Sequence, residues 1–306
     1  EYLLKFGYTT LVDQEVDSNG TLLTDKTQAC ALGGLSYGVT NYEMTAAYAS
    51  IANGGVYNQP VLFTKIIDHD GNVVVDNTTP TSHEVIKPTT AWQLIEAMKS
   101  VVTSGTGTPA RLQSGMTCAG KTGTTSENYD LWFCGMTPYY TAACWWGFDT
   151  PETLTYANGS VYSVDGRNPA GQIWSQVMKD IHKDLPNKTF NTPSTGLTQA
   201  QVCRSTGCLA TNTCTDTYTE TFTTDNLPQK CEGHGTQRIC QVSGKLANEY
   251  CPAESVKSVS YGGTLPKEQL GLWKTLSPSK TGNDQVTETC DVHKKTEENY
   301  FSSAFK

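Results

Sequence analysis

The sequence predicts an α+β fold, in which helices cover an antiparallel sheet, followed by small cysteine-rich repeat modules. Three observations lead to this prediction. Three strand-like apolar runs, separated by short polar turns, lie between residues 118 and 148. Segments with helical periodicity come before and after these runs. Seven of the eleven cysteines follow residue 200. Helices packed on one antiparallel sheet are the α+β arrangement.

The first helix is expected over residues 40–54. Thr40 and Glu43 have capping-box spacing, because the threonine hydroxyl and the glutamate carboxylate can each pair with a free amide of the first turn. Gly54 is a typical residue at a helix end. The apolar residues between these ends are Met44, Ala47, Tyr48 and Ile51.

A hairpin and a second helix are expected next. Asp70-Gly71 is a strong turn signal, and it lies between the strand-like runs 61–68 and 72–76. Pro88 is favoured in the first turn of a helix, and Gly105 ends that helix. The predicted buried face of this helix consists of Ala91, Leu94, Ile95, Met98 and Val102.

Three strands and a last helix complete the first region. The strands are expected at residues 118–125, 131–137 and 141–148, with Pro138-Tyr139-Tyr140 forming the turn between the last two. Cys134 and Cys144 flank this turn symmetrically, which leaves a cross-strand disulfide open. The helix 171–183 is expected to pack on the sheet. One of its faces carries Ile173, Val177 and Ile181, with Trp174 and Met178 beside them.

The chain is expected to form two regions joined by a linker. Residues 1–184 carry five of the six tryptophans, and residues 185–198 are rich in Pro, Asn, Thr and Ser. In the tail, 199–306, segment 202–214 aligns with segment 239–251, and each copy is followed by Cys-x-x-His. This repeat predicts two modules, about 199–235 and 236–293. Modules with so few core residues need cross-links or a metal.

Two kinds of cross-link are consistent with the tail. Disulfides are favoured, because the density of cysteines suggests an oxidising, extracytoplasmic setting. The candidate pairs are Cys203–Cys214 and Cys240–Cys251. Structural zinc is the alternative, since three thiolates and an imidazole form a common zinc site. The two ligand sets would be Cys203, Cys214, Cys231 and His234, and Cys240, Cys251, Cys290 and His293.

Composition sets the remaining bounds. The chain has 306 residues, enough for two domains. Its net charge of -8 argues against a nucleic acid as partner. No apolar run is long enough to cross a bilayer, and no signal peptide opens the sequence. An odd number of cysteines leaves at least one thiol unpaired, and Cys30 and Cys118 are expected to be free buried thiols.

The strongest chemical signal is the Lys-Thr-Gly triplet at residues 121–123. The triplet alone is weak evidence, but further phrases occur in a fixed order around it. They are Ala31-Leu32-Gly33-Gly34-Leu35-Ser36-Tyr37-Gly38, Ala46-Ala47-Tyr48-Ala49, Ala52-Asn53-Gly54-Gly55, Gly105-Thr106-Gly107-Thr108 and Asp130-x-Trp132-Phe133. Through these phrases residues 1–183 resemble the C-terminal half of the transpeptidase domain of class A (bifunctional) penicillin-binding proteins. The resemblance implies part of the penicillin-binding, serine β-lactamase-like fold.

The family's nucleophile lies in a Ser-x-x-Lys motif, followed by Ser-x-Asn, and both precede Lys-Thr-Gly. The opening residues 1–11 resemble the segment just after Ser-x-Asn, so the sequence is interpreted as a fragment without the nucleophilic serine. Ser277-Pro278-Ser279-Lys280 and Ser303-Ala304-Phe305-Lys306 fit the motif, but they follow Lys-Thr-Gly. In the first of them, Pro278 is also poorly placed in the helical turn that the motif needs. Ser126-Glu127-Asn128 and a second Lys-Thr-Gly at 280–282 are likewise interpreted as solvated loops.

The resemblance implies roles for six residues. Lys121 would bring positive charge to the substrate carboxylate and to the proton network around the absent serine. Thr122 and Thr124 hydroxyls would bind that carboxylate, and the Thr124 backbone N–H would form half of the oxyanion hole. Gly123 would allow substrate to approach closely. Thr125 and Ser126 are expected at the rim of the cleft.

Other chemistry-bearing side chains near this strand are given structural roles. Trp132 and Phe133 are expected to be core residues, and Thr106-Gly107 to form a turn that shapes the cleft floor. No histidine is assigned as a general base, and no Ser-His-Asp arrangement emerges. The three histidines of the first region are expected at the surface, and they are His69, His83 and His182.

The expected activity is that of a serine-type D-Ala-D-Ala transpeptidase, which cross-links peptidoglycan through an acyl-serine and is acylated by penicillin; this chain alone is expected to be inactive. The expected partners are peptidoglycan stem peptides, β-lactams and the missing N-terminal half. No cofactor is expected, and the location is the extracytoplasmic face of the plasma membrane, reached through an absent anchor. Two alternatives stay open: a D,D-carboxypeptidase or β-lactam sensor, and a non-catalytic cell-wall-binding protein with a degenerate transpeptidase fold.

Overall fold

The computed structural model describes residues 1–161, 168–262 and 286–294. The chain divides into two compact units, Glu1–Thr195 and Gly196–Lys306. The division falls inside the segment 185–198 that the sequence marks as a linker. In the described part of the chain no helix combines the length and the apolar character that crossing a membrane requires.

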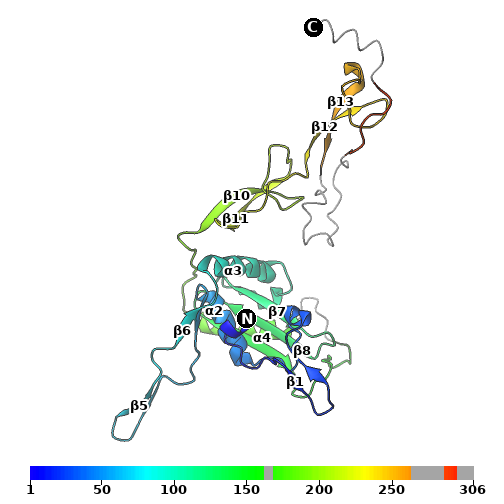
Figure 1. Ribbon diagram of the computed structural model, residues 1–306. Helices are drawn as coiled ribbons and strands as arrows, with labels where there is room; N and C mark the ends of the chain where they lie inside the picture. The colour runs from blue at the N-terminus through cyan, green and yellow to red at the C-terminus, as the bar shows by residue number, and fades with distance from the viewer. Residues whose placement is uncertain (162–167, 263–285, 295–306) are drawn as a thin grey trace. The chain divides into compact units, whose positions relative to one another are not determined.

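A three-stranded antiparallel sheet forms the centre of the first unit (Figure 1). Its strands are β7 (Ala119–Thr124), β8 (Asp130–Met136) and β9 (Thr141–Gly147), in the order β7-β8-β9. The three predicted strands and the turn at Pro138-Tyr139-Tyr140 are therefore confirmed. Because β8 lies in the middle, β7 has a described neighbour on one side only.

The register of the β8–β9 hairpin excludes the predicted contact between Cys134 and Cys144. Cys134 lies opposite Ala143, and Cys144 lies opposite Phe133. Neighbouring residues of a strand point to opposite faces of the sheet, so the two sulfurs lie on different faces. The pairing suggested by the symmetric positions of the two cysteines differs from the observed register by one residue. A shift of one residue moves a side chain to the other face of the sheet. Burial raises the pKa of the Cys134 thiol to about 12.

Helices lie on both faces of this sheet. The helix α2 (Asn41–Ala52) packs against β8 and β9, and α3 (Pro88–Thr103) packs against β7. Both predicted helices are confirmed, including the capping box of Thr40. In α3 the predicted face is right at Ala91, Ile95 and Val102, but Leu94 is exposed.

The helix α4 (Pro169–Ile181) covers the other face. Trp174 and Met178 are buried, and the Trp174 indole meets Phe133 edge-on with 5.1 Å between ring centroids. The Trp174 Nε1 also donates to the carbonyl of Ala142 at 3.1 Å. The other apolar residues that the sequence analysis placed on this helix are exposed, and they are Ile173, Val177 and Ile181.

Glu43 ties the first residues of the chain to α2. Its carboxylate accepts hydrogen bonds from the backbone and hydroxyl of Thr9, each at 2.7 Å, and from the Thr10 hydroxyl at 3.0 Å. It also accepts from the backbone and hydroxyl of Thr40. The capping residue therefore also anchors the N-terminal segment, a role that the helix pattern does not reveal.

Short elements complete the first unit. The predicted Asp70-Gly71 hairpin is confirmed, with β4 (Lys65–Ile67) shorter than expected and β5 (Val73–Asp76) opposite it. Gly71 has a φ of +87°, which a side chain would disfavour. The other short elements are α1 (Tyr2–Lys5), β1 (Glu15–Val16), β2 (Leu22–Leu23), η1 (Gln28–Leu32), β3 (Val56–Asn58), β6 (Ser82–Glu84) and η2 (Thr108–Ala110).

The second unit consists of two similar antiparallel ribbons. One pairs β10 (Leu197–Cys203) with β11 (Thr217–Thr223), and the other pairs β12 (Gly235–Cys240) with β13 (Val256–Tyr261), which follows η3 (Ala253–Ser255). Single bridges also repeat: Val202 pairs with Leu209 in one ribbon, and Ile239 pairs with Leu246 in the other. The repeat in the sequence thus corresponds to a repeat in the structure.

Candidate functional site

The Lys-Thr-Gly triplet lies on β7, at the edge of the described sheet. Hydrogen-bonded and non-bonded residue pairs alternate along an antiparallel ladder. The Thr125 N–H donates to the Asp130 carbonyl at 3.2 Å, so the backbone N–H of residue 125 points towards β8. By alternation, the backbone N–H groups of Thr122 and Thr124 point away from β8, towards the open edge. This edge can therefore donate hydrogen bonds to a ligand laid along it.

Lys121 and the threonines beside it leave the strand on opposite faces. The Lys121 side chain is exposed, and its Nζ reaches around the edge to donate to the Thr122 carbonyl at 2.9 Å. One ammonium group and two outward N–H groups thus gather along this edge. Together they form a surface suited to anionic oxygens.

The turn after α3 contacts the triplet directly. The hydroxyls of Thr106 and Thr122 are 2.7 Å apart, so the two residues share a hydrogen bond. Gly107 closes this turn, its N–H donating to the Val101 carbonyl at 2.9 Å. A Cβ on Gly107 would lie 3.2 Å from the Phe133 ring. The phrase Gly105-Thr106-Gly107-Thr108 marked this turn in the sequence, but the contact with Thr122 was not predicted.

Thr125 and Ser126 lie in the turn between β7 and β8. The Thr125 hydroxyl accepts from the backbone N–H groups of Tyr129 and Asp130, each at 2.9 Å. These bonds make Thr125 a residue that shapes the turn. Ser126 is exposed, and Asn128, the end of the Ser-x-Asn look-alike, has a φ of +55° typical of a tight turn.

Two glycines of β7 are explained by their neighbours on β8. A Cβ on Gly120 would lie 2.5 Å from the Phe133 ring, and one on Gly123 would lie 3.2 Å from the Trp132 Cβ. Phe133 is fully buried, as predicted, whereas Trp132 is only partly buried. Gly123 therefore has a packing reason for lacking a side chain, in addition to the substrate approach that the resemblance implies.

The histidines lie apart from the triplet, but His182 is not a surface residue as predicted. It is 4% exposed, its Nε2 lies 2.8 Å from the Thr137 hydroxyl, and its Nδ1 lies 2.7 Å from the Met178 carbonyl. These contacts give it a structural role at the end of α4. His69 and His83 are exposed, as expected.

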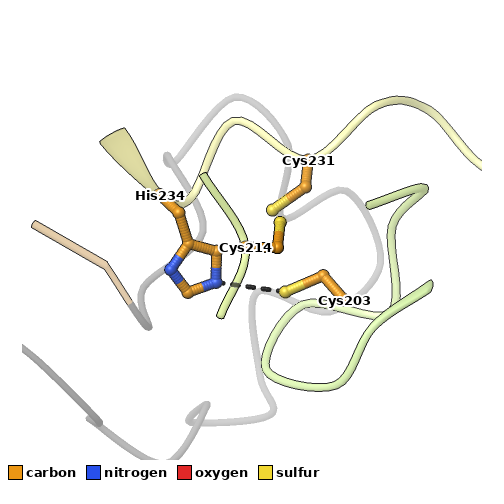
Figure 2. A group of neighbouring side chains, drawn as sticks. All are labelled: Cys203, Cys214, Cys231 and His234. Carbon is orange, nitrogen blue, oxygen red and sulfur yellow. Dashed lines mark hydrogen bonds between the residues drawn. The ribbon is translucent and has the colours of Figure 1, made fainter. Parts of the chain in front are cut away.

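In the second unit the structure brings together both sets of tail residues that the sequence singled out. Figure 2 shows the first set, Cys203, Cys214, Cys231 and His234. Within each set the possible ligand atoms all lie within 4.8 Å of one another. All eleven cysteines carry free thiols, so neither predicted pair, Cys203–Cys214 or Cys240–Cys251, is a disulfide here. Cys30 is only partly buried, whereas Cys118 is buried as expected.

The sequence comparisons identify the family. The family described as "Penicillin binding protein transpeptidase domain" matches residues 1–162, more than half of the 306-residue chain. The chain belongs to this family. A penicillin-binding protein 1A of Clostridium botulinum is 34% identical over 266 residues, covering 84% of this chain and 30% of that protein. Another, from Clostridium tetani, is 34% identical over 215 residues, covering 70% and 26%. The chain thus spans about a third or less of these relatives.

Solved structures support the same fold. The penicillin-binding protein PonA1 of Mycobacterium tuberculosis aligns with a TM-score of 0.53 and 27% identity, covering 63% of this chain and 51% of that one. The same protein is known in complex with penicillin V. Penicillin-binding protein 1A of Haemophilus influenzae aligns with a TM-score of 0.54 over 74% of this chain and 36% of that one. Its identity of 22% supports the fold alone.

Proposed function

We propose that this chain provides the Lys-Thr-Gly side of a peptidoglycan D,D-transpeptidase site, which acts together with a serine nucleophile from outside the sequence. One observation carries the proposal. In a chain of the transpeptidase family, Lys121-Thr122-Gly123-Thr124 lies on an open edge strand with the Thr124 N–H directed outwards. The two later Ser-x-x-Lys look-alikes, at 277–280 and 303–306, lie outside the described residues.

In the proposed reaction, the serine hydroxyl attacks the carbonyl carbon of a D-Ala-D-Ala bond. The Thr124 N–H stabilises the negative oxygen of the tetrahedral intermediate, and the N–H of the serine completes the oxyanion hole. The C–N bond then breaks, and D-Ala leaves with the proton taken from the serine. An amine of a second stem peptide attacks the resulting ester, and its proton returns to the serine as the new amide forms.

Binding of the substrate carboxylate would use the other groups of the edge. Lys121 supplies the positive charge, and Thr122 and Thr124 supply hydroxyl donors. The contact of Thr106 with Thr122 would hold that hydroxyl in one orientation. A β-lactam presents a carboxylate and a reactive carbonyl at similar positions and would acylate the same serine. Stem peptides and β-lactams are thus the expected ligands, on the outer side of the plasma membrane.

The proposal requires a longer polypeptide in which a Ser-x-x-Lys precedes this sequence, and the test uses that polypeptide. Intact-mass analysis should show one penicilloyl adduct on that polypeptide and none on the 306-residue chain alone. Lys121→Ala should slow acylation by about 10²–10³-fold, the usual cost of losing one such electrostatic contact. Lys65→Ala is the matched control, because Lys65 pairs with Asp76 on the distant hairpin, and it should acylate at the wild-type rate.

Three outcomes would contradict the proposal. An adduct on the 306-residue chain would place the nucleophile inside it. Equal acylation rates for the Lys121 and Lys65 variants would remove the role of Lys121. A folded longer polypeptide without any adduct would favour the non-catalytic alternative. Product analysis with a stem-peptide donor and an amine acceptor separates transpeptidation from hydrolysis, because only transpeptidation yields a cross-linked product.

A further inference from the structure

We propose that the second unit holds two zinc ions, one in each ribbon module, and that each ion is bound by three cysteine thiolates and one histidine. The first site consists of Cys203, Cys214, Cys231 and His234, and the second of Cys240, Cys251, Cys290 and His293.

The donor geometry fits zinc. A tetrahedral centre with Zn–S bonds of about 2.3 Å and Zn–N bonds of about 2.0 Å places its donors about 3.5–3.8 Å apart. All four donors of each set lie within 4.8 Å of one another. In the first set the Cys203 Sγ lies 3.0 Å from the His234 Nε2 (Figure 2). In the second, the His293 Nδ1 lies 3.4 Å from the Cys240 Sγ and 3.5 Å from the Cys290 Sγ.

The modules lack the apolar core that would otherwise hold them together. Among the described residues of the second unit, Val202 is the only buried hydrophobic residue apart from cysteines. The buried cysteines are the ligands themselves: Cys203, Cys231, Cys240 and Cys290. Domains of this size with so little apolar burial need a cross-link or a metal to fold. The centre of each module is therefore its cysteine–histidine cluster.

A comparison of the two modules separates ligands from other cysteines. The Cys203 N–H donates to the Cys208 carbonyl at 2.8 Å, and the Cys240 N–H donates to the Lys245 carbonyl at 2.9 Å. Cys208 and Lys245 thus occupy equivalent positions. Lys245 instead pairs with Glu288 and Asp291. The three cysteines and the histidine that occur in both modules are the residues that cluster. Cys208 has no counterpart in the second module, and it lies outside the cluster.

The backbone around the sulfurs is arranged alike in both modules. The Thr211 N–H donates to the Cys214 Sγ at 3.4 Å, and the Asn248 N–H donates to the Cys251 Sγ at 3.4 Å. Gly207 and Gly244 each have a φ of +70° and close a tight turn onto the carbonyl of the first ligand. Hydrogen bonds to sulfur, such as those from the Thr211 and Asn248 N–H groups, stabilise thiolates bound to a metal.

Disulfides would explain fewer of the clustered side chains than a zinc ion does. A bond between Cys203 and Cys214 would leave the third sulfur and the imidazole of the cluster without a role, and the same holds in the second module. Four protein ligands close the zinc tetrahedron, so the ions have a structural role and leave no position for substrate. Binding would protect the thiolates from oxidation outside the cell and couple the folding of each module to the metal.

The test measures zinc in the full chain, purified under reducing conditions without chelators. Mass spectrometry of the metal content should give two zinc ions per chain. Cys214→Ser and Cys251→Ser should each lose one ion, and the double variant should lose both. Cys208→Ser is the matched control and should keep two. Because the two single variants each spare one module, loss of folding in one module does not hide the result.

A second measurement examines the ligands in the unmodified chain. Replacement of zinc by Co²⁺ should produce sulfur-to-cobalt charge-transfer bands and the intense d–d bands of a tetrahedral site. A chain that binds no zinc when it is reduced and supplied with zinc chloride would overturn the proposal. A Cys208→Ser variant that loses an ion would overturn the ligand assignment. A separate sample is isolated without a reductant. In it, cysteines joined in disulfides would resist alkylation and lower the intact mass by two hydrogens per bond, which would also refute the sites.

Discussion

At the scale of single residues, Glu43 shows how one side chain serves two segments. It belongs to the capping box of α2, and it also receives three hydrogen bonds from Thr9 and Thr10. It is 7% exposed. Burial alone would raise the pKa of Glu43, but hydrogen bonds from Thr9 and Thr40 outweigh burial and lower the pKa to about 2. The ionised carboxylate is therefore the form that stabilises the fold.

The consequence is a defined dependence of stability on pH. The folded pKa lies below the reference value of 4.5, so the contribution of Glu43 is complete above about pH 4.5 and is lost as the pH falls towards 2. Glu43→Gln should lower the free energy of unfolding by about 2–3 kcal/mol at neutral pH, because an amide nitrogen cannot accept these bonds. Thermal unfolding between pH 7 and pH 2 measures both effects.

The difference between wild type and variant should shrink in acid, since both side chains are then neutral. Glu127→Gln is the control, because Glu127 is exposed in the turn after β7. It should change stability by less than about 0.5 kcal/mol. A difference between Glu43→Gln and wild type that stays constant down to pH 2 would show that the carboxylate charge has no such role.

At the scale of elements, the packing of α4 on the sheet depends on an absent side chain. Gly135 of β8 lies beneath Trp174, and a Cβ there would lie 2.5 Å from the Phe133 ring and 2.8 Å from the Trp174 ring. Gly171, in the first turn of α4, has room instead, since its nearest neighbour would lie 3.6 Å away, at Ala110. The two glycines thus differ in what they can accept.

Alanine at each position tests this difference. Gly135→Ala should destabilise the first unit by about 1–3 kcal/mol, the usual cost of overpacking a core. Gly171→Ala should be neutral or stabilising by up to about 1 kcal/mol, because alanine favours the helix. Denaturant unfolding followed by tryptophan fluorescence gives both values. Equal destabilisation by the two substitutions would contradict the packing described for α4.

The sequence located most elements, but it did not determine every packing face or register. Capping and turn residues at Thr40, Pro88 and Asp70-Gly71 act locally, so the two helices and the hairpin were predictable. The packing face of α4 depends on contacts distant in sequence, with Phe133 and Ala142, and periodicity alone did not decide which of its apolar residues make them. The register of Cys134 and Cys144 depends on one residue in a turn, which the symmetry of the sequence does not determine.

In the candidate sites, too, contiguous motifs were predictable from the sequence, whereas contacts between distant residues were not. The triplet at residues 121–123 is contiguous, so its motif predicted the strand that carries it. The hydrogen bond between Thr106 and Thr122 and the turn-forming role of Thr125 depend on three-dimensional contacts and were not predicted. In the tail, the repeated spacing grouped the cysteines and histidines correctly. The choice between disulfides and a metal needed the positions of the sulfurs.

At the scale of the whole chain, the two units are stabilised by different means. The first unit has two clusters of buried apolar side chains, one around Phe133 and Trp174 and the other around Ile95 and Met136. The second has a single buried hydrophobic residue besides its cysteines among those described. If zinc holds the second unit, its removal should unfold that unit alone.

Hydrogen exchange with and without a zinc chelator tests this expectation. Amides of β10 to β13 should exchange much faster once the metal is removed, because two-stranded sheets without an apolar core unfold locally with little cost. Amides of β7 to β9 should keep their protection, and tryptophan emission should hardly change, since five of the six tryptophans precede residue 195. Protection that survives the chelator but is lost on reduction would instead mean that disulfides hold the second unit. Simultaneous loss of protection in both units would show that they fold as one.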